Sequence, residues 1–253
     1  MDIQEIIYEE GTQEKEFREK GSRGKKNKKT ESQQKVTYDG IRKDPEIHLL
    51  IEKGNEMLGI LGYTEHSVKH AAKVAKASGD ILKKLGYGKR VIELSRIAGY
   101  MHDIGNSINR NDHAHSGAIL AYQLLKERGM PLEEAIKVAS AIGNHDEKTG
   151  TAVDAISAAL IIGDKTDVRR NRVRNRQISG FDAHDRVNYA VLSSELTVSA
   201  EKKIIKMDMD LDDSMCTVMD YFEIFLERMV MCRRAAELLG CRFKLTANGS
   251  KLC

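Results

Sequence analysis

Ile-Ala-Gly-Tyr-Met-His-Asp-Ile-Gly-Asn, residues 97–106, joins the end of an apolar helical segment to a loop at Gly105. His102 and Asp103 are adjacent at this junction. A neutral imidazole nitrogen and a carboxylate oxygen at a helix end can bind one divalent cation. The dipeptide recurs at His184-Asp185, so a His-Asp pair alone is weak evidence and the rest of the sequence has to decide.

Composition favours a helical intracellular protein. At 253 residues and 41% hydrophobic, the chain can form one domain, or a main domain with a small appendix. The chain has only two Pro, and this scarcity favours helices. A net charge of +3 does not by itself indicate nucleic-acid binding. The four Cys lack zinc-type spacing, and the chain has neither a secretion signal nor an apolar run of about 20 residues. We therefore expect a cytoplasmic protein that does not enter a membrane.

Residues 1–40 differ from the rest of the chain. The run Gly21–Lys29 contains five basic residues and no acidic or apolar side chain. Such a segment buries too little surface to offset its ordering entropy, so we expect disorder. The alternative is a basic tether that makes weak contact with nucleic acid. Either way, residues 1–36 are predicted to be dispensable for catalysis on small substrates.

The central part of the chain is predicted to be a set of helices. Periodic apolar residues, end glycines and capping residues place them at 44–62, 64–85, 89–102, 111–129, 131–146 and 152–167. The last of these is apolar nearly all round, which predicts a buried helix. Asp164 lies at its end, where an unpaired carboxylate is costly, so we expect a cation beside it.

The periodicity changes after Arg176. Alternating segments 187–198 and 203–211 predict a β-hairpin, 214–239 a long amphipathic helix, and 243–246 a short third strand. The predicted fold is mainly α, with a helical bundle followed by a small α+β C-terminal appendix.

The candidate metal ligands come from several of the predicted helices. Each lies at or near a helix end or beside small residues, and a helical bundle can bring such side chains to one pocket. A set of imidazoles and carboxylates suits Mn, Fe, Co, Ni, Zn or Mg. In chain order the candidates are His70, His102, Asp103, His113, His145 and Asp164.

This ordered set resembles the HD-domain superfamily of metal-dependent phosphohydrolases over residues 60–176. The matching motifs are His70-Ala-Ala-Lys-Val-Ala, Met-His-Asp-Ile-Gly around His102, and Ile-Gly-Asp-Lys-Thr-Asp around Asp164. The Gly-Tyr-Pro hallmark of the cyclic-di-guanylate branch is missing. The resemblance implies an HD-type bundle, which we place at residues 41–178, with the C-terminal subdomain at 179–253.

The resemblance also implies roles for the ligands. His70, His102, Asp103 and Asp164 would hold a primary ion, and His113 and His145 would hold a second ion bridged by Asp103, giving one or two ions per chain. The pair His102-Asp103 is thereby assigned to catalysis.

Other candidates flank this set. His66 is assigned to catalysis or substrate binding because it shares a helical face with His70, although a surface position is equally consistent. Lys165 receives the same two roles. His115 is interpreted as a residue that supports a ligand or lies on the surface, and His184-Asp185 as a loop pair. Lys165 and three arginines recur at helical spacing and predict a cationic stripe for phosphate, or else a solvated helix face. The three arginines are Arg169, Arg172 and Arg176.

The predicted function is hydrolysis of a phosphoester of a small metabolite or nucleotide by metal-activated water. One alternative is a nucleic-acid-binding or nuclease-like HD protein that uses the basic tail and the arginines. The other is a non-catalytic ligand sensor. The separate appendix suggests a partner or a homo-oligomer contact.

Overall fold

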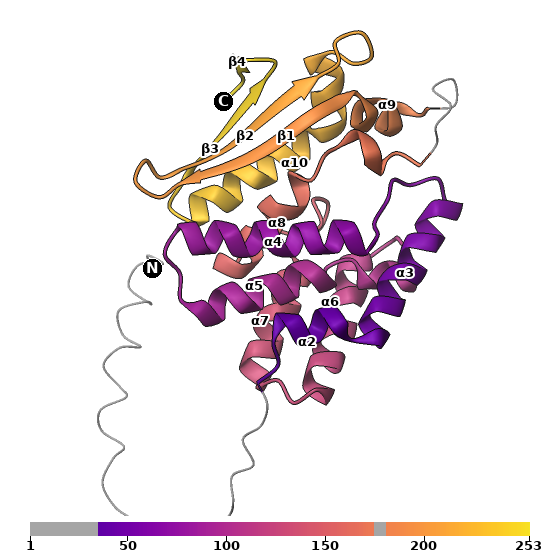
Figure 1. Ribbon diagram of the computed structural model, residues 1–253, viewed down its shortest axis with the longest axis vertical. Coiled ribbons are helices and arrows are strands. Elements are labelled where there is room, and N and C mark those ends of the chain that lie inside the picture. Colours follow the sequence, from indigo (N-terminus) through magenta and orange to yellow (C-terminus); the bar gives the residue numbers. More distant parts are fainter. Residues whose placement is uncertain (1–34, 175–180) are drawn as a thin grey trace, which may run out of the picture. The chain divides into compact units, whose positions relative to one another are not determined.

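The computed structural model describes residues 35–174 and 181–253 (Figure 1). The expectations for residues 1–34 and for Arg176 lie outside these ranges. The first part is helical: α2 (Tyr38–Lys43), α3 (Pro45–Ile60), α4 (Val68–Lys84), α5 (Lys89–Met101), α6 (His113–Glu127), α7 (Leu132–Gly143) and α8 (Ala155–Lys165), with 3-10 turns η2 (Ile104–Ser107) and η3 (Arg170–Arg172). Residues 38–40, which we assigned to the N-terminal segment, belong to α2.

The C-terminal part contains a small sheet. It consists of α9 (Ala183–Ala190), β1 (Val191–Ser199), β2 (Ile204–Leu211), α10 (Val218–Leu238), β3 (Arg242–Ala247) and β4 (Ser250–Lys251). The strands lie in the order β1-β2-β3-β4. The predicted hairpin is confirmed as the antiparallel pair β1 and β2, whereas β3 runs parallel to β2 after the α10 crossover. Strand β4 was not predicted. The chain is therefore mainly helical with a small C-terminal sheet.

Helix α8 connects the two parts through their hydrophobic cores. Ile156 and Leu160 pack into the cluster of the helical bundle, while Ile161 and Ile162 pack into the cluster shared with the sheet and α10. The prediction that this helix is buried is confirmed, because nearly all its residues are inaccessible. Asp154 fixes its start with a capping box that includes Ser157. The end of α8, which carries Asp164, is thus held from both sides.

The start of α4 differs from our expectation. Ser67, not Thr64, caps the helix by accepting a hydrogen bond from the backbone of Lys69. His66 therefore precedes the helix, and the predicted shared helical face with His70 is wrong. Instead, the Asn55 side chain accepts a hydrogen bond from the His66 backbone at 3.0 Å, which anchors this residue to α3.

Two further expectations after α8 are corrected. Lys165 is the last residue of that helix, and the chain then continues as loop and η3, so the cationic stripe at helical spacing does not form. His184 and Asp185 lie in α9, which replaces the expected loop and the first residues of the expected strand. Short-range alternation at 187–190 was misleading because Val187 and Ala190 face the core from a helix.

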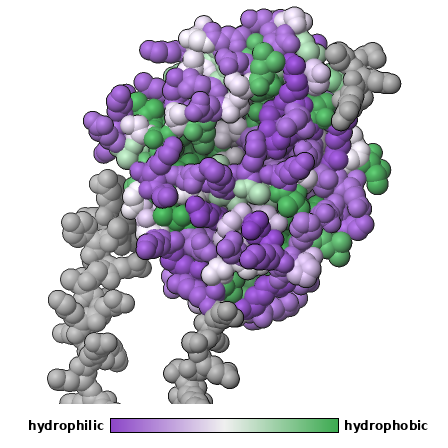
Figure 2. All heavy atoms as spheres, viewed as in Figure 1, coloured by the Kyte–Doolittle hydropathy of each residue, from purple (hydrophilic) through white to green (hydrophobic). Residues whose placement is uncertain are grey.

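The face of the molecule drawn in Figure 2 is mostly polar. Figure 2 shows hydrophobic residues on this face as separate patches among hydrophilic ones. In the part of the chain that the structure describes, every helix is too short or too polar to span a bilayer.

Candidate metal centre

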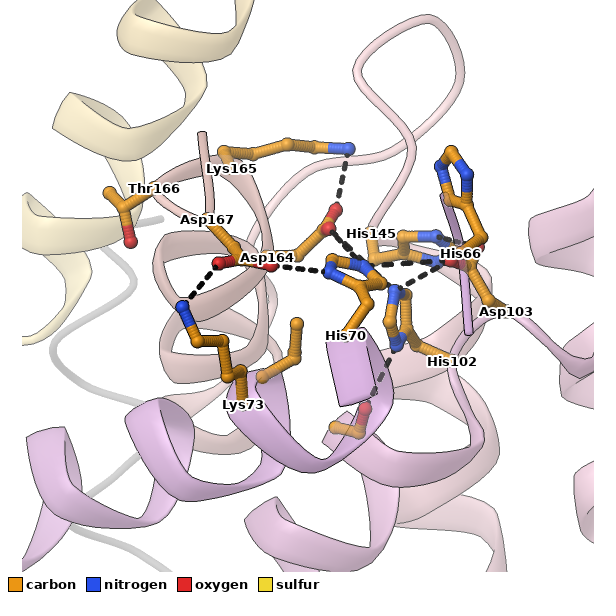
Figure 3. A network of polar contacts seen from close by, with 12 residues as sticks. His66, His70, Lys73, His102, Asp103, His145, Asp164, Lys165, Thr166 and Asp167 are labelled. Atoms are coloured by element: carbon orange, nitrogen blue, oxygen red, sulfur yellow. Dashed lines mark hydrogen bonds and ion pairs between the residues drawn. The ribbon is translucent and has the colours of Figure 1, made fainter. Parts of the chain in front are cut away.

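The first half of the site lies where α4, α5 and α8 meet (Figure 3). His70 Nε2 is 3.3 Å from Asp164 Oδ1, and His102 Nε2 is 3.6 Å from the same oxygen. Asp103 Oδ2 lies 3.1 Å from His102 Nε2 and 3.7 Å from His70 Nε2. Two imidazole nitrogens and two carboxylate oxygens thus converge on one buried point.

The opposite ring nitrogens fix the tautomers. His102 Nδ1 lies 2.9 Å from the carbonyl oxygen of Gly99, and His70 Nδ1 lies 2.7 Å from Asp167 Oδ2. Because these oxygens only accept, both Nδ1 atoms carry the proton. In the neutral form of each ring, Nε2 therefore directs a lone pair toward the carboxylates, and neither Nε2 has a hydrogen-bond partner among the described residues.

Facing lone pairs at buried positions are unfavourable unless a positive charge lies between them. The pKa of His102 shows that a positive charge is favoured at this point. Burial lowers it, but Asp103 and Asp164 more than compensate and raise the pKa of His102 to about 10. A proton or a divalent cation can supply the charge. The nitrogen and oxygen donors fit a divalent cation of the Mn, Fe or Zn type.

The second half of the site uses the other oxygen of Asp103. His113 Nε2 lies 3.5 Å from Asp103 Oδ1, and His145 Nε2 lies 3.9 Å from it. The two Nε2 atoms are 3.2 Å apart, and each Nδ1 donates to a backbone carbonyl, of Arg110 and Ile142 respectively. Asp103 therefore lies between two groups of imidazoles and contacts both.

Gly105 allows these elements to approach. A Cβ at this position would lie 2.0 Å from the carbonyl oxygen of His113, at the start of α6. The neighbouring Asn106 donates to Asp103 Oδ1 at 2.9 Å, which orients the carboxylate. The loop of the 97–106 stretch thus brings the second histidine pair to Asp103.

A chain of charges leads from Asp164 to the C-terminal part. Lys165 Nζ lies 2.9 Å from Asp164 Oδ2 and 2.6 Å from Glu147 Oε2. The Arg228 Nε atom, from α10, donates to the other oxygen of Glu147 at 3.0 Å. Burial opposes the charged form of Glu147, but Lys165 and Arg228 hold the pKa of its carboxyl well below the usual range. Lys165 is buried and its pKa is raised by Asp164 and Glu147, against the effect of burial, so it stays charged.

The site opens into a cavity of about 610 Å³. His66 lines this cavity, and its Nδ1 lies 2.8 Å from the Thr64 carbonyl oxygen. Burial, together with the nearby charge of Arg172, keeps the pKa of His66 well below its usual value. Arg172 also lines the cavity, and its Nε donates to the Glu65 carbonyl at 2.9 Å. Arg169 does not, because it pairs with Asp167 at 2.9 Å. The structure therefore brings His66, Lys165 and Arg172 to the cavity and excludes Arg169.

Sequence reasoning missed several residues of the site. Asp167 belongs to the motif around Asp164 but received no role. Its spacing of three residues from Asp164 could have indicated that both carboxylates lie near the site. Glu147 and Arg228 had no local signal, because their contacts depend on α10 packing against α8. His115 is a surface residue with a side chain 55% exposed, as expected. His184, which we interpreted as unconnected with the site, lines the cavity.

Comparison with known proteins gives three findings. Residues 67–190 match the family model described as the HD domain. An uncharacterized protein of Methanocaldococcus jannaschii is 27% identical over 164 residues, and ribonuclease Y of Oceanobacillus iheyensis is 35% identical over 106 residues. These alignments span 55% and 38% of this chain, but 62% and 19% of the two relatives. A solved structure of a predicted HD superfamily hydrolase from an uncultured Thermotogales bacterium is 24% identical in sequence, with a TM-score of 0.39. The match covers 49% of this chain and 67% of the solved chain.

Proposed function

We propose, from the premise that this chain is an HD-domain protein over residues 67–190, that it is a divalent-metal-dependent phosphohydrolase of small phosphoesters. One observation carries the proposal: the buried Nε2 atoms of His70 and His102 lack a hydrogen-bond partner among the described residues while two carboxylates face them. A cation completes that arrangement. His70, His102, Asp103 and Asp164 would hold it.

When bound, a divalent cation would lower the pKa of the water that it holds and would stabilise the negative charge on the phosphoryl oxygens. The chain's own residues position the reacting groups around that ion. Asp103 presents one oxygen to each histidine group. Because His66 is neutral and its Nδ1 donates to a carbonyl, its Nε2 can accept a hydrogen bond from water or substrate.

Positive side chains supply the phosphate contacts. Lys165, Arg172 and Arg228 line the cavity together with Asp164. Ammonium and guanidinium groups donate to phosphoryl oxygens. Arg169 does not line the cavity and its guanidinium contacts Asp167, so we no longer propose it as a substrate ligand.

The cavity supports a small substrate. Its volume of about 610 Å³ falls in the range of small-molecule sites. Aromatic residues make up 5% of the chain and Trp is missing from it, so a stacking surface for single-stranded nucleic acid is thin. A phosphorylated metabolite or a nucleotide fits these features.

The test combines metal content with activity. The purified protein should contain divalent metal and should hydrolyse members of a panel of phosphomonoesters and phosphodiesters with Mn, Fe or Mg. His102→Ala and Asp103→Ala should lose both metal and hydrolysis while the helical circular dichroism remains. His115→Ala, an exposed histidine, is the matched control and should behave like wild type. Retained activity in either site variant would refute the assignment.

We propose two ions per chain, because Asp103 contacts His113 and His145 through Oδ1 and the first histidines through Oδ2. Elemental analysis after reconstitution should give a ratio near two. A ratio that stays near one with excess metal would reassign His113 and His145 to substrate binding.

A nuclease is the second candidate, favoured by the similarity to ribonuclease Y over 106 residues. An oligoribonucleotide in the same panel, at equal phosphate concentration, separates the two. A clear preference for the oligonucleotide that persists at raised salt would favour the nuclease, because non-specific phosphate contacts weaken with salt.

A further inference from the structure

Helices α9 and α10 supply part of the lining of the cavity. Asp185 and Asn188 are three residues apart on α9, and Phe225 and Arg228 are three residues apart on α10. Residues at this spacing share a helical face. All four line the cavity, so each helix presents one face to it.

Two polar residues of α9, Asp185 and Asn188, are largely buried and border the cavity. Asp185 is 9% exposed and Asn188 is 6% exposed. The Asp185 backbone N–H donates to Asp182, but no described residue donates to the Asp185 carboxylate, and burial raises its pKa. Asn188 donates through Nδ2 to the His184 carbonyl at 2.8 Å, which leaves its Oδ1 without a described donor. An acceptor oxygen that borders a cavity and has no donor among the described residues can accept a hydrogen bond from a ligand that donates.

The charges of the cavity wall set the orientation of a ligand. A carboxylate repels phosphate and accepts hydrogen bonds from hydroxyl or amino groups. The phosphate would therefore contact Lys165 and Arg172, and the organic part of the ester would contact Asp185. Phe225, under the Arg228 guanidinium at 4.6 Å, supplies an apolar surface beside it.

We propose that Asp185 and Asn188 form a specificity subsite that binds a hydroxyl or amino group on the organic part of the substrate. This inference rests on the proposed function. It makes the substrate a phosphate ester of a hydrogen-bond-donating alcohol, such as a sugar, a polyol or an amino alcohol, rather than of an apolar alcohol.

The test compares esters with and without donors. The probes are ribose 5-phosphate, phosphoethanolamine and, as the donor-free reference, phenyl phosphate, with Mn-loaded protein. In Asp185→Ala the ratio of kcat/KM for the donor-bearing ester to that for phenyl phosphate should fall about tenfold or more, because a buried acceptor discriminates strongly. Asp185→Asn keeps one acceptor oxygen and should lose less. The more affected ester identifies hydroxyl or ammonium as the recognised group.

A second readout does not depend on turnover. Asp185→Asn removes a largely buried carboxylate that has no donor among the described residues, and it should raise the melting temperature of the substrate-free protein. Asp210→Asn, the same change at an exposed position on β2, should alter neither the ratio nor the melting temperature.

An unchanged ratio in Asp185→Ala, an equal loss for all three esters, or a lower melting temperature of Asp185→Asn would overturn the subsite. If metal-loaded wild type hydrolyses none of these esters or the wider panel, the proposed function fails instead. The subsite is then judged by calorimetric binding of ribose 5-phosphate, and equal affinity in wild type and Asp185→Ala would overturn it.

Discussion

Removing the carboxylate of Asp167 should weaken metal binding although this residue is not among the expected ligands. Asp167 Oδ2 lies 2.7 Å from His70 Nδ1, and its side chain is 9% exposed. This contact holds the proton on Nδ1 and turns the lone pair of Nε2 toward Asp103 and Asp164. A carboxylate behind a metal-binding histidine fixes its tautomer and raises its basicity.

The size of the effect follows from this geometry. Loss of such a supporting partner typically costs about 10–100-fold in metal affinity, or about 1.4–2.8 kcal/mol. Asp167→Asn retains an oxygen that can accept from Nδ1, so we expect the lower end, about tenfold. Asp167→Leu removes the acceptor and leaves a buried N–H unpaired, so we expect about 100-fold.

The assay is equilibrium dialysis against Mn, with metal measured in both compartments and circular dichroism to confirm the fold. Glu134→Gln is the matched control, because it breaks a half-buried carboxylate–arginine pair with Arg90. It should leave the metal affinity within about twofold of wild type. A folded Asp167→Leu protein with wild-type affinity would refute the reasoning.

Three further predictions concern other parts of the chain. Gly105→Ala should lower both metal content and melting temperature, because the added Cβ would lie 2.0 Å from the His113 carbonyl oxygen; wild-type values would contradict this. Glu147→Gln should make the stability of the protein less sensitive to acid. The pKa of the Glu147 carboxyl is lowered in the folded state, so this group stabilises the fold above its unfolded pKa of about 4.5, and that stabilisation is lost as pH falls. Melting curves between about pH 3 and 6 measure this, and an unchanged slope would count against it. Deletion of residues 1–34 should leave turnover of a small phosphoester within about twofold, whereas weaker binding to nucleic acid alone would support a tether.

Sequence patterns predicted the helical class, and together with the family resemblance they identified the candidate metal ligands. Helical periodicity and capping residues identified α3 to α8 because their apolar faces and ends are encoded locally. The order of His70, His102-Asp103 and Asp164, with the resemblance based on it, predicted that these side chains converge. In the structure, each of the two histidine Nε2 atoms lies within 3.7 Å of an oxygen of both carboxylates.

Errors arose where local pattern and packing disagree. The arginines after Lys165 have helical spacing, yet α8 ends at Lys165 and the buried Asp167 draws Arg169 to itself. The segment 187–190 alternates like a strand, but it closes α9 against the core. Tertiary contacts determined both outcomes.

The sequence by itself therefore determined that the protein is helical and carries imidazole and carboxylate side chains that could hold a cation, since these properties reside in residue type, order and short-range spacing. Tertiary structure alone decided what surrounds these side chains. Glu147 reaches Lys165 and Arg228, and Asp185 lines the same cavity, because α10 packs on α8 and α9 packs on α10. Contacts between residues so distant in the chain depend on how buried faces pack, which no local pattern specifies.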